Sequence, residues 1–94
     1  MIPVDLERFP GGTLVSQGLR DLSRGEDTIP ALLVLVGAPR LRRLGLSIPE
    51  TRLRDVEHVL YERLAEADTD AAHGRYNALI RLLVSFERAA ECAG

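Results

Sequence analysis

The stretch "AAHGRYNALIRLLVSFERAAE", at residues 71–91, decides the fold class. Apolar side chains return along it every three or four residues, which is the period of a helix with one buried face. The members of this stripe are Ala72, Tyr76, Leu79, Leu83, Phe86 and Ala90. Ile80, Leu82 and Val84 widen the stripe until the middle of the helix is apolar nearly all round. The pattern predicts a long C-terminal helix, at about residues 70–92, that is central in a helical bundle.

Shorter helical segments are expected ahead of this helix. A "PGGT" turn precedes a helix at residues 14–24, which Gly25 ends. Thr28 or Ile29 begins the next helix, because Pro30 is tolerated in a first helical turn. Residues 31–36, all apolar, fit either a buried helix or a buried strand. We favour the helix because no second strand is available to pair with it, and a short helical turn at residues 39–44 follows.

The clearest local signal is "SIPE", at residues 47–50. In a capping box, the Ser47 side chain accepts a hydrogen bond from the Glu50 amide while the Glu50 side chain reaches back to the Ser47 amide. The sequence therefore predicts a helix from Ser47 to about residue 67. Its buried stripe would consist of Leu53, Val56, Leu60 and Leu64. The "DTD" at residues 68–70 then ends this helix and caps the last one. The expected fold is all-α, a compact bundle of four to five helices in one domain, residues 1–94.

Composition places the chain among globular proteins. It has 94 residues, of which 46% are hydrophobic and 28% charged, and one domain accommodates them all. Cys92 is the only cysteine, so an intramolecular disulfide and a cysteine metal cluster are excluded, and the sequence assigns it no role. The first residues lack the pattern of a secretory signal, and the longest apolar run is too short to cross a bilayer. We therefore expect a soluble, cytoplasmic protein that does not insert into a membrane.

Charge is sorted along the middle of the chain. Residues 38–54 sum to +4 and residues 55–70 sum to −5. The arginines of the basic part are Arg40, Arg42, Arg43, Arg52 and Arg54. They could bind an anionic partner, either nucleic acid or an acidic protein. Alternatively, they could face water or pair with the acidic residues 55–70. The net charge of −2 and pI near 5.6 disfavour nucleic acid. A helix-turn-helix motif is also disfavoured. The segment after Gly37 has a proline and arginines at the positions where a recognition helix needs buried apolar residues. We favour the interpretation that these arginines lie on an exposed face and do not bind an anionic partner.

Two pairs of side chains could suggest a metal site. His58 and Glu62 are four residues apart, and Asp70 and His73 three apart, on two helices that could lie side by side. His58 and Glu62, however, fall off the apolar stripe of their helix, so we expect them in solvent. No serine stands in a nucleophile elbow. We therefore expect that the protein is not an enzyme and that it binds no metal ion and no cofactor.

The apolar surplus of the last helix predicts the function class. A short-chain bundle has few helices with which to enclose Ile80, Leu82 and Val84, and an exposed apolar patch marks an interaction site. The commonest assembly of identical chains is a dimer with two-fold symmetry. The sequence predicts a small non-enzymatic protein that acts through protein–protein contacts, as a homodimer that uses these three residues. The alternative is a nucleic-acid-associated regulator that uses the arginine-rich residues 40–54.

Overall fold

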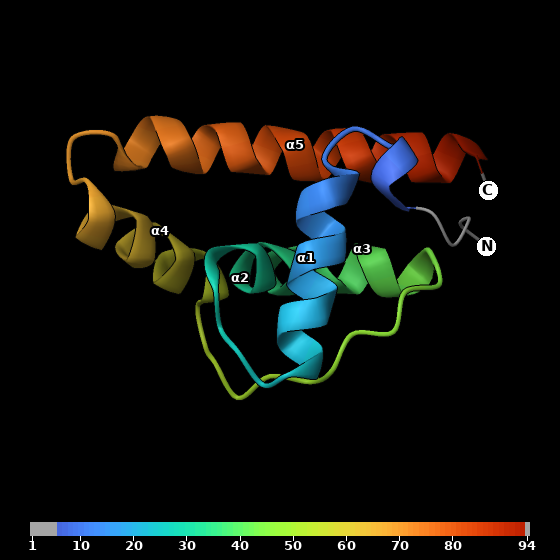
Figure 1. Ribbon diagram of the computed structural model, residues 1–94, viewed down its shortest axis with the longest axis horizontal. Helices are drawn as coiled ribbons and strands as arrows, with labels where there is room; N and C mark the ends of the chain where they lie inside the picture. The colour runs from blue at the N-terminus through green and yellow to red at the C-terminus, as the bar shows by residue number, and fades with distance from the viewer. Residues whose placement is uncertain (1–5, 94) are drawn as a thin grey trace.

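The computed structural model describes residues 6–93, and all regular structure in that range is helical. In chain order the elements are a 3-10 turn η1 (Leu6–Arg8) and the helices α1 (Gly12–Ser23), α2 (Ile29–Val36), α3 (Ala38–Arg43), α4 (Val56–Ala67) and α5 (Ala72–Ala93). Figure 1 shows α5 running along one side of the molecule, with α2, α3 and α4 along the other and α1 crossing α2. The all-α prediction is confirmed.

Helix α2 is the most completely buried element. Five consecutive residues, from Ala31 to Leu35, have at most 8% of their surface exposed. The Thr28 side chain accepts a hydrogen bond from the Ala31 amide and caps the helix, with Pro30 in the first turn. Helices α1, α4 and α5 all pack against α2. Because neighbours cover it on several sides, its sequence shows an unbroken apolar run and not a stripe.

The C-terminal helix α5 packs against the other helices, chiefly against α4 and α2. Leu83, Phe86 and Ala90 are buried there, and the Phe86 ring meets the edge of Phe9, with 5.8 Å between ring centroids. Helices α2, α3 and α4 all lie on the same side of α5 (Figure 1). The opposite side of α5 therefore has no covering layer of helices in the described residues.

The helix expected to begin at Ser47 does not begin there. Helix α4 begins at Val56, and residues 46–53 have no regular structure. The Arg42 side chain donates hydrogen bonds to the carbonyls of Ile48, at 3.1 and 3.0 Å, and of Pro49, at 3.0 Å. A helix starting at Ser47 would need the Ile48 carbonyl for the amide four residues later. The hydrogen bonds from Arg42 and the burial of the Ile48 side chain outweigh the predicted capping box. Leu53, which was expected in the buried stripe of this helix, is 39% exposed.

Candidate functional site

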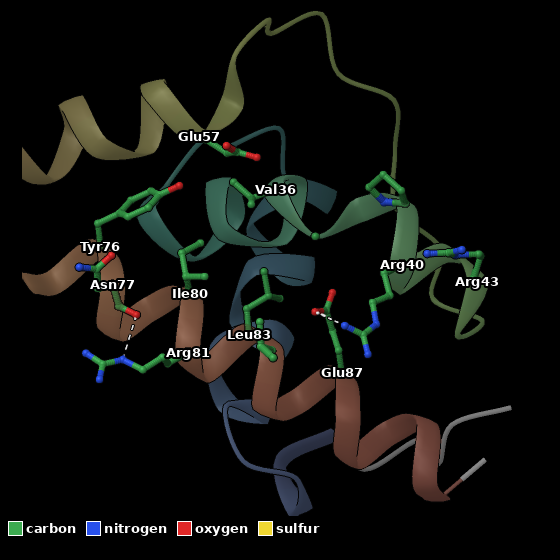
Figure 2. Close-up of a pocket in the computed structure, with 13 residues that line it drawn as sticks. Val36, Arg40, Arg43, Glu57, Tyr76, Asn77, Ile80, Arg81, Leu83 and Glu87 are labelled. Atoms are coloured by element: carbon green, nitrogen blue, oxygen red, sulfur yellow. Dashed lines mark hydrogen bonds and ion pairs between the residues drawn. The ribbon is translucent and has the colours of Figure 1, made fainter. Parts of the chain in front are cut away.

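A groove of about 790 Å³ lies beside α5, where the corner between α2 and α3 and the first turn of α4 face it (Figure 2). Its volume is within the range of about 300–1,000 Å³ that is usual for binding pockets. The residues that line it are Val36, Gly37, Pro39, Arg40, Arg43, Glu57, Tyr76, Asn77, Ile80, Arg81, Leu83, Val84 and Glu87. The groove combines an apolar floor with charged side chains at both ends.

The floor brings together two of the three apolar residues that the sequence singled out. Ile80 and Val84 stand one turn apart on α5 and are partly buried in the groove, beside Leu83 and Val36. Leu82 lies on another side of the helix, where its backbone carbonyl approaches Gly11 and its side chain is 39% exposed. The separation follows from helix geometry, since two residues along a helix correspond to about 200° around it.

Arg40 joins α3 to α5 at one end of the groove. Its Nε donates to Glu91 Oε1 at 2.6 Å, and its Nη1 lies 3.4 Å from Glu87 Oε1. Glu87 is only 4% exposed. Burial raises the pKa of Glu87, and the Arg40 charge opposes that shift, whereas the hydrogen bond from Arg40 lowers the pKa of Glu91. The groove therefore contains one buried carboxyl group, Glu87, in a long ion pair with Arg40, whose shorter ion pair is with the exposed Glu91 outside the groove lining.

Close approach of the two layers at this end depends on Gly37. A Cβ at that position would come within 3.0 Å of both Leu83 methyl groups and 3.1 Å of Glu87 Oε2. Such contacts are tighter than nearly all that real side chains make. A side chain at this position would therefore have to displace the ends of Leu83 and Glu87 by a few tenths of an ångström, and glycine leaves both in place beside the α2–α3 corner.

The five arginines of the expected basic patch do not form one surface. Arg40 and Arg43 line the groove, whereas Arg42 binds the carbonyls of the 46–53 segment and lies 3.8 Å from Glu50. Arg52 and Arg54 are exposed on the loop before α4. The Arg40 side chain pairs with α5 and not with the acidic residues 55–70 that the sequence suggested. The packing of α3 thus divides the basic segment between two sides.

The opposite end of the groove carries Glu57, Tyr76, Asn77 and Arg81. Burial raises the pKa of Tyr76, and the nearby Glu57 carboxylate adds to that shift. Arg81 donates to the Asn77 carbonyl at 3.4 Å on its own helix (Figure 2). Glu57 belongs to the first turn of α4 and is exposed. This end therefore carries an exposed carboxylate and the exposed Arg81, and the end near Arg40 carries the exposed Arg43.

The pairs considered as metal ligands lie apart from the groove lining. His58 Nε2 is 2.7 Å from Glu62 Oε1 on the exposed face of α4, and His73 contacts Asn77 and the Tyr61 ring. Within residues 6–93, no three His, Cys, Asp or Glu side chains are grouped so that they could hold a metal ion. Cys92 is exposed near the end of α5.

Sequence reasoning missed Glu57 and Glu87 as parts of the site. For Glu87 a signal was present, since it follows Val84 by three residues and so lies on the same face of α5. No local pattern could have found Glu57, because its place at the groove depends on how α4 packs. The apolar residues of α5 and the arginines of α3 looked like two separate candidate surfaces. The structure brings part of each together in the groove, namely Ile80 and Val84 with Arg40 and Arg43.

Comparison of the chain with protein-family models, with curated proteins and with solved structures gave no match. Among the helices of residues 6–93, none combines the length and the apolar character that crossing a membrane requires.

Proposed function

We propose that this protein is non-enzymatic and acts through protein–protein contacts, as a homodimer whose contact surface is the α5 groove. The observation that carries the proposal is the floor of the groove, where Ile80 and Val84 are only partly buried. Apolar side chains in a groove with a charged rim are the usual anatomy of a protein interface, whose centre is apolar and whose edge is polar. Burying them against a second protein surface removes apolar area from water, which favours association.

The groove supports this proposal better than it supports nucleic-acid binding. Of the arginines that would grip phosphates, Arg40 is held by two carboxylates and Arg42 by backbone carbonyls. The buried Glu87 and the exposed Glu57 also face the same groove and would repel phosphates. A nucleic-acid interface needs a continuous basic surface, and these contacts interrupt it.

The mass in solution tests the proposal. We expect light scattering at tens of micromolar to give a dimer for the parent and a monomer for Ile80→Glu/Val84→Glu. Leu82→Glu is the control and is matched in charge to Val84→Glu alone, because it puts one carboxylate on another side of α5, and it should leave the dimer intact. Circular dichroism checks that each variant folds, and Val84→Glu alone replaces the double variant if that one unfolds. A parent that is monomeric under these conditions overturns the proposal.

A further inference from the structure

The strap, residues 46–55, joins α3 to α4 and lies between two residues with a positive φ angle. Gly45 has φ 103°, and Asp55, directly before Val56, has φ 52° and ψ 53°. Left-handed backbone is uncommon for a residue with a side chain, although aspartate adopts it more often than most. Within the described part of the chain, the Asp55 side chain makes no capping hydrogen bond. Helix α4 therefore starts at a backbone reversal and not at a capping side chain.

Arg42 holds the strap in its non-helical form. Its side chain donates two hydrogen bonds to the Ile48 carbonyl, at 3.1 and 3.0 Å, and one to the Pro49 carbonyl, at 3.0 Å. In a helix, these two carbonyls would accept from the amides four residues later. One of those amides, that of Leu53, instead donates to the Thr51 side chain at 3.1 Å. The arginine and a longer α4 therefore compete for the same two carbonyl groups.

The strap and a longer helix place different side chains in the core. In the strap, Ile48 is 7% exposed and Leu53 is 39% exposed. Five residues along a helix correspond to about 140° around it, so a helix turns these two side chains to different faces. Leu53 precedes the buried Leu60 by seven residues, which is close to two full turns. Helix formation therefore takes Ile48 off the core face of α4 and puts its isomer Leu53 on it.

We infer that the strap is a conformational switch, in which residues 48–55 join α4 as helix when Arg42 releases the two carbonyls. The longer helix starts at Ser47, where the capping box of Ser47 and Glu50 satisfies two amides that have no partner inside the helix. Asp55 then takes ordinary helical backbone angles. The strap links α3 to α4, and both helices line the groove, so the switch adjoins the groove. The inference does not depend on what the groove binds.

Backbone NMR chemical shifts at residues 48–55 test the switch. We expect non-helical Cα shifts there in the parent and helical shifts in Arg42→Ala, with a gain of about eight helical residues in circular dichroism. Arg43→Ala removes the neighbouring arginine from the same helix and should leave these shifts non-helical. Adding Ser47→Ala to Arg42→Ala should reduce the helical shifts, because only the released form uses this cap. The same Ser47→Ala in the parent should change none of them.

A second pair of variants replaces Arg42→Ala if that variant does not fold. Arg42→Lys/Asp55→Ala keeps the charge without the planar fork and disfavours the left-handed backbone, so its strap should become helical. Arg42→Lys/Asp55→Gly permits the left-handed backbone and should be less helical at residues 48–55. Non-helical shifts there in a folded Arg42→Ala, or in Arg42→Lys/Asp55→Ala where it is used, overturn the switch. Helical shifts that Ser47→Ala leaves unchanged, or that Arg43→Ala also produces, overturn it as well.

Discussion

At the scale of single residues, Glu87 and Glu91 pair with the same arginine, but their pKa values shift in opposite directions because only Glu87 is deeply buried. Folding raises the pKa of Glu87 above its ordinary 4.5, because burial disfavours the charged form. The folded chain therefore holds this proton more tightly than the unfolded chain does. The protonated group contributes stability below pH 4.5, and this contribution is lost as pH rises through the folded-state pKa. Glu91 has a lowered pKa, so its contribution is present above pH 4.5 and is lost as pH falls through the lowered value.

Glutamine substitutions test these signs. At pH 7 we expect the free energy of unfolding of Glu87→Gln to equal or exceed that of the parent, because an uncharged amide avoids the burial cost of the carboxylate. Glu91→Gln should be less stable than the parent at pH 7, because Arg40 loses its shortest ion pair. Both differences should shrink toward pH 4. Urea unfolding at the two pH values measures them. A marked loss of stability in Glu87→Gln at pH 7 would show that the ion pair with Arg40 outweighs the cost of burial.

At the scale of elements, two hydroxyl side chains that look alike in sequence differ in what they cap. Thr28 caps α2 and also donates a hydrogen bond to the buried Asp21, whereas Ser47 is exposed on a segment that is not helical. We expect Thr28→Ala to cost about 0.5–2 kcal/mol, as the loss of an N-cap usually does. Ser47→Ala should change stability by less than about 0.5 kcal/mol. Chemical denaturation of both variants is the measurement, and equal losses would contradict the observed start of α4.

The packing of α1 on α2 depends on a glycine, and a second glycine provides the matched control. A Cβ at Gly18 would lie 2.4 Å from the Pro30 carbonyl oxygen and 2.5 Å from a Val34 methyl group, whereas one at Gly74 would meet nothing within 4 Å. We expect Gly18→Ala to cost about 1–3 kcal/mol, since overpacking forces the two helices apart. Gly74→Ala should stabilise the protein by up to about 1 kcal/mol, because alanine favours a helix. Thermal unfolding compares them, and a stabilised Gly18→Ala would mean that α1 and α2 are not in such close contact.

At the scale of the whole molecule, the distribution of charge argues against a phosphate-binding surface. The net charge is −2, and the arginines of residues 40–54 are divided between the groove and the loop before α4. We expect no detectable binding to a generic DNA or RNA duplex at moderate salt, either by the parent or by Arg40→Ala/Arg42→Ala/Arg43→Ala. Fluorescence anisotropy with a labelled duplex makes the measurement. Micromolar binding by the parent, with a steep salt dependence that the triple variant loses, would support the nucleic-acid function instead.

The longest helix is left with an open face because its neighbours in the other layer lie on one side of it. Helices α2, α3 and α4 all lie on the same side of α5 (Figure 1), and Leu82 remains 39% exposed within residues 6–93. The surplus of apolar residues in the middle of α5 was visible in the sequence. Its consequence, a groove and not a flat patch, depends on how far the α2–α3 corner stands from the helix.

The sequence by itself determined the helical class and most of the helix ends. The spacing of apolar residues identified α5, and Thr28, Pro30 and Gly25 marked the ends of α1 and α2, because helix periodicity and capping act within a few residues. The same reasoning failed at Ser47, where a local capping signal competed with hydrogen bonds from Arg42 and lost.

Only the tertiary structure decided the groove. Arg40 meets Glu87 and Glu91 across 47 and 51 residues of chain, and Glu57 arrives from a third element. Contacts at such separations follow from the packing of α3 and α4 on α5, and periodicity along one helix carries no information about them. The reason is physical: a helix's own hydrogen bonds close within four residues, whereas a groove exists only where helices that are distant in sequence pack side by side.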